Sequence, residues 1–182
     1  MTAKEFVKNI NEAQLSFEFL KSQFGESFAN DFLEEGRITQ EKQEFIEYNN
    51  EILNLSLNYD LSKFRVINIS FDDDQFRDKQ EIFFGWEVNG DRLGFNIDTK
   101  EVFAYYIHTE KISGYCAPND MIFLDVLFEL HKLNNQRMSL DDDEKISMLD
   151  KEFMHKMTRF FVDQKYIGFY SVVIGYEDDD EV

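Results

Sequence analysis

The residues of this chain whose spacing could support metal binding lie in one short segment. Glu152 and His155 have the Glu-x-x-His spacing that places two ligands on one face of a helix. A di-iron site needs this motif twice, together with Glu residues from other helices, and the sequence contains it once. We therefore favour an ordinary amphipathic helix here, with no metal and no cofactor.

A second candidate for chemistry is Cys116, the single cysteine of the chain. A thiol nucleophile needs a base within hydrogen-bond reach, such as His108, and a third group that orients this base. A small buried residue is the favoured interpretation of Cys116. The sequence has no Gly-x-Ser-x-Gly, P-loop or dinucleotide-binding motif. We predict that the protein is not an enzyme; a metal or thiol enzyme that uses Glu152, His155 or Cys116 is the least favoured hypothesis.

Three consecutive acids, Asp72, Asp73 and Asp74, follow an expected strand. An EF-hand that began at Asp72 would need Gly and Glu where the chain has Arg77 and Phe83. A calcium loop is therefore disfavoured. Two interpretations stay open: a solvated acidic loop, or a surface that meets a basic partner, because complementary charge accelerates encounter.

Aromatic residues in the middle of the chain could bind a protein partner. Strand alternation places Phe103, Tyr105 and Ile107 on one face of an expected strand and Tyr106 on the other. The first three are expected to pack beneath helices. In the alternative interpretation, Tyr or Trp side chains on an open face anchor a partner, as aromatic residues do at hot spots. The candidate partner-binding residues, with Glu87 and Asp91 as a charged rim, are Asp72, Asp73, Asp74, Trp86, Glu87, Asp91, Tyr105 and Tyr106.

The composition disfavours several classes of partner. The chain has 182 residues and a formal net charge of −18, which is spread over its whole length. This charge repels phosphate backbones and disfavours binding to nucleic acid. No apolar run approaches the roughly 18 residues that a membrane-spanning helix requires, and the first residues do not resemble a secretory signal. We expect a cytoplasmic protein with no nucleic-acid or membrane partner, and its oligomeric state is left open.

The sequence predicts one folded domain over residues 1–182, with a frayed acidic end at 177–182. Its 20 Phe residues and 43% hydrophobic content are typical of a packed core. A capping box of Thr2 and Glu5 opens a helix whose apolar positions continue to Leu20. A second helix is expected to end at Gly36 and a third segment to begin at Thr39. Whether Asn49-Asn50 interrupts this third segment is left open.

The middle and end of the chain predict a sheet followed by helices. Helices are expected from about Met121 to Leu133, capped by Asp120, and after Asp141. His131 would then lie near a helix end, where the dipole favours a cation. Strands are expected at 64–71, 82–88, 91–97, 101–108 and 166–176, with Asn89-Gly90 as a type I′ turn. The predicted fold class is α+β, an antiparallel meander of about five strands flanked by N-terminal and C-terminal helices.

The segment from Trp86 to Leu130 combines several of these features. An aromatic strand leads into the turn Asn89-Gly90-Asp91, followed by the strand 93–98, a Val-aromatic strand from Val102, and a helix with Phe123, Leu124 and Phe128. This order resembles the SUKH superfamily, the Smi/Knr-type proteins best known as bacterial toxin-immunity proteins. The earlier residues Phe28, Phe32, Leu33 and Gly36 are similar to the early helix of that family.

The resemblance implies a SUKH-like domain in a non-enzymatic immunity protein that binds and neutralises a cognate secreted toxin. The acidic composition would suit a basic toxin such as a nuclease, because opposite charges steer association. The alternative hypothesis is a regulatory or scaffolding protein-interaction module of the same fold.

Overall fold

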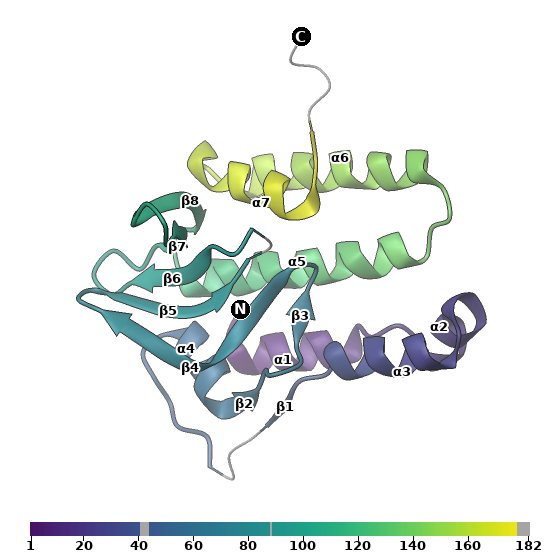
Figure 1. The fold of residues 1–182 in the computed structure, drawn as a ribbon, viewed down its shortest axis with the longest axis horizontal. Helices are drawn as coiled ribbons and strands as arrows, with labels where there is room; N and C mark the ends of the chain where they lie inside the picture. Colours follow the sequence, from purple (N-terminus) through teal and green to yellow (C-terminus); the bar gives the residue numbers. More distant parts are fainter. Residues whose placement is uncertain (41–43, 88, 178–182) are drawn as a thin grey trace.

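The structure is a computed structural model that describes residues 1–40, 44–87 and 89–177, without the side chains of Asp73 and Asp74 (Figure 1). It is a mixed α and β fold, in which the strands of an antiparallel sheet follow the N-terminal helices in the chain and precede the C-terminal helices. The predicted α+β class is therefore confirmed. Of the acidic end, residues 178–182 lie outside the described part of the chain.

The first helices are α1 (Ala3–Glu12), α2 (Phe17–Phe24) and α3 (Glu26–Glu35). The predicted capping box is present: the Thr2 hydroxyl accepts from the Glu5 N–H at 3.3 Å, and the Glu5 carboxylate accepts from the Thr2 N–H at 2.8 Å. The continuation of this helix to Leu20 is wrong. The helix ends at Glu12, with Ala13 as its C-cap, and Ser16 caps a new helix by accepting from the N–H of Phe19.

The helix expected to begin at Thr39 begins only at Glu51, and residues 41–43 of the expected segment lie outside the described part of the chain. A two-stranded sheet forms instead between β1 (Thr39–Gln40) and β2 (Tyr59–Asp60), with α4 (Glu51–Asn58) before the second strand. Asparagine side chains explain the late start of this helix. Asn50 caps it by accepting from the Leu53 N–H at 3.0 Å, and buried Asn58 accepts from the Ile46 N–H at 2.7 Å. These amides bond to backbone groups that a helix would otherwise pair.

Within the described residues, the main sheet has six strands in sequence order, all antiparallel, so the predicted meander is confirmed. The strands are β3 (Arg65–Val66), β4 (Ile69–Asp78), β5 (Glu81–Trp86), β6 (Arg92–Asn96), β7 (Val102–Tyr106) and β8 (Lys111–Ala117). The expected strand 64–71 is divided in two by a turn at Ile67, whose φ is 55°. The acidic run that begins at Asp72 belongs to β4 and not to a loop.

The C-terminal half contributes α5 (Asp120–Met138), α6 (Asp143–Phe160), the short 3-10 helix η1 (Gln164–Tyr166) and α7 (Ile167–Ile174). The helix α5 is capped by Asn119 rather than by Asp120, since the Asn119 side chain accepts from the Ile122 N–H at 2.9 Å. The strand expected at 166–176 is wrong, because this segment forms η1 and α7. In its place β8 forms the sheet edge, and α7 packs against that strand.

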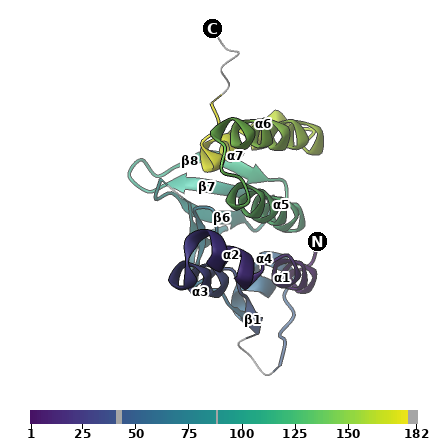
Figure 2. The same ribbon diagram turned by 90° about the vertical axis from the view of Figure 1, so that its right-hand side faces the viewer.

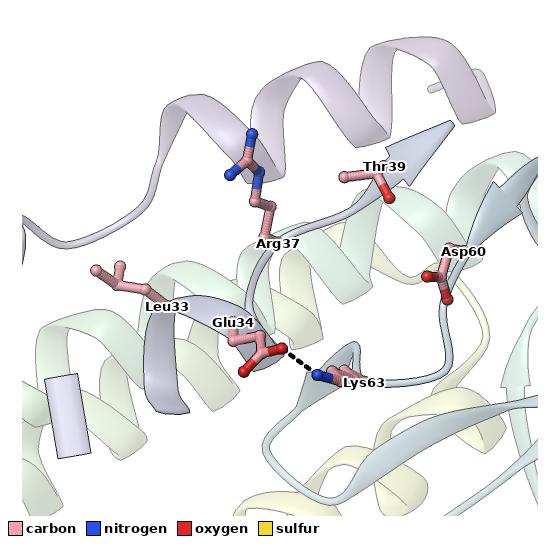
Figure 3. A pocket seen from close by; sticks show the side chains of 6 residues that line it. All are labelled: Leu33, Glu34, Arg37, Thr39, Asp60 and Lys63. Atoms are coloured by element: carbon pink, nitrogen blue, oxygen red, sulfur yellow. Dashed lines mark hydrogen bonds and ion pairs between the residues drawn. The ribbon is translucent and has the colours of Figure 1, made fainter. Parts of the chain in front are cut away.

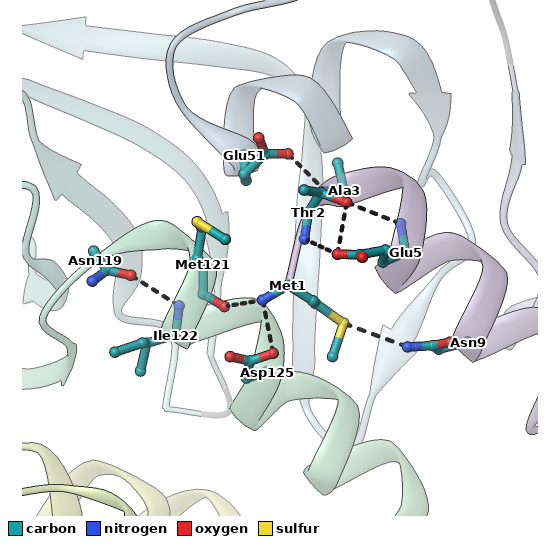
Figure 4. Close-up of polar contacts among 10 residues, drawn as sticks. All are labelled: Met1, Thr2, Ala3, Glu5, Asn9, Glu51, Asn119, Met121, Ile122 and Asp125. Carbon is teal, nitrogen blue, oxygen red and sulfur yellow. Dashed lines mark hydrogen bonds and ion pairs between the residues drawn. The ribbon is translucent and has the colours of Figure 1, made fainter.

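The helices α1, α4 and α5 lie on one side of the main sheet (Figures 1 and 2). The amino group of Met1 donates to the Met121 carbonyl at 3.1 Å and to Asp125 at 2.8 Å, which fixes α1 beside α5 (Figure 4). Glu51 of α4 accepts from the Ala3 N–H at 2.8 Å. The opposite face of the sheet has no covering helix among the described residues. The central buried residues of the core include Phe6, Phe64, Phe84, Phe123, Leu127 and Tyr170.

Candidate protein-binding face

A β-bulge in β5 turns two large aromatic residues to the helix-free face of the sheet. Phe83 lies opposite Gly94 and Trp86 lies opposite Arg92, with a register shift between these pairs. Without the bulge, two residues three positions apart would point to opposite faces. The extra residue, Phe84, is fully buried on the core side, with its ring centroid 5.6 Å from that of Phe123.

Gly85 permits this bulge because the backbone of the neighbouring strand passes very close to it. A Cβ atom at Gly85 would lie 2.2 Å from the Ser70 carbonyl oxygen. Real Cβ atoms essentially never approach a backbone oxygen so closely. A residue without a side chain is therefore required where β4 and β5 pair.

Asp72, Trp86 and Arg92 form a polar cluster on the helix-free face. The Trp86 Nε1–H donates to Asp72 Oδ1 at 2.6 Å, and the Arg92 guanidinium forms an ion pair with Asp72 Oδ2. The guanidinium also lies over the Trp86 ring, 4.6 Å from its centroid. The side chains of Asp72 and Arg92 are each 21% exposed. The cluster thus fixes the Trp86 ring and balances the Asp72 charge with the Arg92 charge.

A group of aromatic rings continues this face beside the polar cluster. Phe83 is 4% exposed, and its ring centroid lies 6.0 Å from that of Phe103 and 5.4 Å from that of Tyr105. Phe76 stacks on Phe83 at 6.2 Å and is 55% exposed. We call the set Asp72, Phe76, Phe83, Trp86, Arg92, Phe103 and Tyr105 the aromatic face. It is a rigid apolar floor with one ring, Phe76, projecting into solvent.

Acidic side chains surround one end of the aromatic face. Partial desolvation raises the pKa of Tyr105, and the negative charges of Glu110, Glu81 and Asp78 raise it further. Asp78 and Glu81 lie opposite each other where β4 meets β5, while the neighbouring Arg77 pairs with Ile82 and points to the other face. A positive group on a partner would therefore find several carboxylates near this end.

The structure places Glu87 and Asp91 on the core side of the sheet and not in an exposed rim. Both are buried, because each is one residue away from Trp86 or Arg92 and alternation turns it inward. Glu87 accepts from the Asp91 N–H at 3.0 Å, and Asp91 accepts from the Ser113 hydroxyl. Burial raises the pKa of Glu87. Both acids therefore stabilise the hairpin end, and the charged rim expected from them is wrong.

The remaining candidates from the sequence lie apart from the aromatic face. Tyr106 points to the opposite face from Tyr105, at the end of β7, where it is 40% exposed beside His108. The side chains of Asp73 and Asp74 lie outside the described part of the chain. The expectation that Phe103 and Tyr105 pack beneath helices is wrong, because Val102 and Ala104 take the core side instead.

Arg92, Phe76 and Phe83 were not predicted from the sequence as members of this face. The register of the hairpin would have predicted Arg92, because it decides which residue lies opposite Trp86. The two-residue turn expected at Asn89-Gly90 would pair Trp86 with Leu93, whereas the observed bonds join Glu87 to Asp91 and so pair Trp86 with Arg92. A longer loop of this kind, with Gly90 at a φ of 82°, is the second common solution for such hairpins.

The residues considered for enzymatic chemistry are not brought together. Cys116 is fully buried, and burial raises the pKa of its thiol well above the usual value. Glu152 and His155 lie exposed on α6, and the described residues contain no group of three His, Cys, Asp or Glu that could hold a metal ion. His131 is not at a helix end, because α5 continues to Met138. Burial lowers the pKa of His131 to about 4, so it is neutral rather than a cation.

A hollow of about 410 Å³ lies between α3 and the β1–β2 pair (Figure 3). It is lined by Leu33, Glu34, Arg37, Thr39, Asp60 and Lys63. Glu34 and Lys63 form an ion pair across it, and Asp60 accepts from the N–H and hydroxyl of Ser62. Because these carboxylates already have partners, the hollow offers few free groups to a ligand.

No protein-family model, curated protein or solved structure matches this chain. The resemblance to the SUKH superfamily therefore stays a prediction from the sequence. No described helix combines the length and the apolar character needed to cross a membrane.

Proposed function

We propose that this protein is a non-enzymatic immunity protein that binds a cognate, basic protein toxin through its aromatic face and so neutralises it. The observation that carries the proposal is the position of Phe76, which is 55% exposed on a floor of buried aromatic rings. Aromatic residues anchored in this way are typical of interface hot spots.

The rigidity of the face supports a role in binding. Trp86 is held by the Asp72 carboxylate and by the Arg92 guanidinium. Phe83 is held by the Phe76 ring on β4 and by the Phe103 and Tyr105 rings on β7. A preorganised surface loses little side-chain entropy when a partner docks. The face therefore provides an apolar contact area at low conformational cost.

The charge around the face supports a basic partner. Asp78, Glu81 and Glu110 lie close enough to raise the pKa of Tyr105. The whole chain carries a net charge of −18. Such a surface accelerates association with a positively charged protein and disfavours acidic ones. A secreted nuclease, whose own surface must attract phosphates, would have the required charge.

The test is coexpression of the full chain with the protein encoded by the neighbouring gene, measured by growth rescue and by copurification. Phe76→Ser and the pair Asp78→Lys/Glu81→Lys should each abolish rescue and weaken the complex. The matched control is Asp141→Lys/Glu152→Lys, which makes the same charge change at exposed positions in and before α6. This control should rescue growth as the unchanged protein does.

Two outcomes would contradict the proposal. Absence of both association and rescue would remove the immunity function. Capture of a cellular protein through Phe76, without rescue from any toxin, would favour the regulatory or scaffolding alternative.

A further inference from the structure

The helical hairpin formed by α2 and α3 lies largely outside the hydrophobic core. Throughout 17–35, a segment that is completely described, Leu20 and Ala29 are the only fully buried residues, and neither belongs to the main core cluster. Both helices lie to the right of the main sheet in Figure 1. The hairpin turns sharply at Gly25, whose φ of 93° favours glycine.

Three phenylalanine rings form a stack along this hairpin. The ring centroids of Phe24 and Phe28 are 5.0 Å apart, and those of Phe28 and Phe32 are 5.8 Å apart. Phe24 is 45% exposed and Phe28 is 39% exposed. Helices of eight and ten residues depend on tertiary packing for their stability. A stack of exposed rings on such helices is therefore apolar surface that a partner could cover.

The charge of the hairpin restricts the kind of partner. Its single base, Lys21, forms an ion pair with Glu26. Asp31 and Glu35 are exposed acids that follow Phe28 and Phe32 by one helical turn on α3, and Glu18 is an exposed acid of α2. A second copy of this chain or an anionic membrane would bring like charges together. A positively charged partner would bring opposite charges together instead.

We propose that the α2–α3 hairpin is a second docking surface, separate from the aromatic face, which binds a basic amphipathic helix of a protein partner. Apolar side chains one helical turn apart on that helix cover Phe24, Phe28 and Phe32, which is how amphipathic helices present their apolar face to a partner. Its Lys or Arg residues lie beside Asp31 and Glu35. This proposal does not depend on the partner being a toxin.

The probe is a fluorescein-labelled synthetic helix of Leu and Lys residues, with Leu at helical spacing, added to the full chain. Fluorescence anisotropy should show saturable binding. The variant Phe24→Ser/Phe28→Ser should weaken this binding at least tenfold, and Asp31→Lys/Glu35→Lys should also weaken it. Phe160→Ser, which removes a ring that is 43% exposed at the end of α6, outside both proposed surfaces, should leave the affinity unchanged. A matched peptide of Leu and Glu residues should not bind.

Because Phe24 and Phe28 lie outside the main core cluster, their replacement should leave the fold of the rest of the chain intact, and circular dichroism checks that residues 17–35 stay helical. Asp31→Lys/Glu35→Lys, which leaves the ring contacts in place, tests the surface without this risk. Hydrogen exchange of residues 17–35 should slow when the Lys peptide is bound. The proposal is overturned if the peptide does not bind, or if its affinity is unchanged in the hairpin variants. Sedimentation that shows a dimer lost in Phe24→Ser/Phe28→Ser would also overturn it, in favour of a second copy. If Phe76→Ser loses toxin rescue but still binds the peptide, the toxin and the peptide bind at different surfaces.

Discussion

Trp86 and Arg92 lie directly opposite each other in the β5–β6 ladder, with the guanidinium carbon of Arg92 4.6 Å from the centroid of the Trp86 ring. Asp72, on the next strand, accepts a hydrogen bond from each of them. The positive charge of Arg92 is therefore balanced within the aromatic face. The acids at Asp78, Glu81 and Glu110 remain to interact with a partner.

Replacement of Asp72 by Ala should destabilise the protein by about 1–3 kcal/mol, because it leaves a partly buried guanidinium and the Trp86 N–H without their acceptor. Trp86 is the only tryptophan, so its fluorescence reports on this site alone. We expect a lower urea midpoint and a red-shifted emission maximum in the folded state. Asp141→Ala, at an exposed position, should change neither quantity. An unchanged emission maximum in Asp72→Ala would show that the hydrogen bond to Trp86 does not position the ring.

The pairing of Trp86 with Arg92 shows how far the sequence could predict this face. A hairpin at this place and the antiparallel meander followed from local signals and are confirmed, whereas the type I′ turn predicted at Asn89-Gly90 is wrong, because the loop has three residues. The partner of Trp86 did not follow, because one additional residue in the loop moves every cross-strand pair by one position. The bulge at Phe84 depends in turn on the approach of Ser70 to Gly85, a contact with another strand that local sequence does not encode.

The prediction of a strand at 166–176, where η1 and α7 form, failed for a different reason. This segment contains Ile167, Phe169, Val172 and Val173, and such an apolar run gives no periodicity that separates a buried strand from a buried helix. Tertiary packing decides the outcome, since the Tyr170 hydroxyl donates to the Cys116 carbonyl of β8 at 2.5 Å. The strand β8 itself was missed, because its short sequence contains Gly114 and lacks clear alternation.

Gly85→Ala should destabilise the protein by roughly 1–3 kcal/mol, the usual cost of forcing extra volume into packed structure. The new methyl group would meet the Ser70 carbonyl at 2.2 Å, and this neighbour is backbone that cannot rotate away. Gly168→Ala is the matched control. It lies in α7 with no atom within 4 Å of the added carbon, so it should be neutral or stabilise by up to about 1 kcal/mol. Equal urea midpoints for the two variants would contradict the close approach at Gly85.

Cys116 should be almost inert towards alkylation in the folded protein. Its thiol is fully buried, and burial raises its pKa well above the usual value, so little reactive thiolate forms at neutral pH. We expect iodoacetamide to react at least on the order of 10²-fold more slowly with the folded chain than with the chain in urea. Mass spectrometry of timed samples measures both rates. A fast reaction in the folded state would instead support the thiol enzyme hypothesis.

Acid should destabilise the protein through His131 at pH values where most carboxylates are still charged. Burial lowers the pKa of His131 from 6.5 to about 4, so the unfolded chain binds a proton in this range that the folded chain does not. The free energy of unfolding is unaffected by His131 above pH 6.5, where the imidazole is neutral in both states. It decreases as the pH falls towards 4, by about 3 kcal/mol in total. The neutral ring can also accept from the Asn135 side chain, 3.2 Å away, which the protonated ring cannot do.

Urea titrations between pH 7 and pH 4.5 measure this dependence. His131→Leu should flatten it, whereas His155→Gln, at an exposed position of α6, should retain it. Glu87, whose pKa is raised by burial, contributes with the opposite sign, and its contribution is the same in both variants. The difference between the His131→Leu and His155→Gln slopes therefore isolates the buried imidazole. Parallel slopes in the two variants would show that His131 is already protonated, or accessible to solvent, in the folded protein.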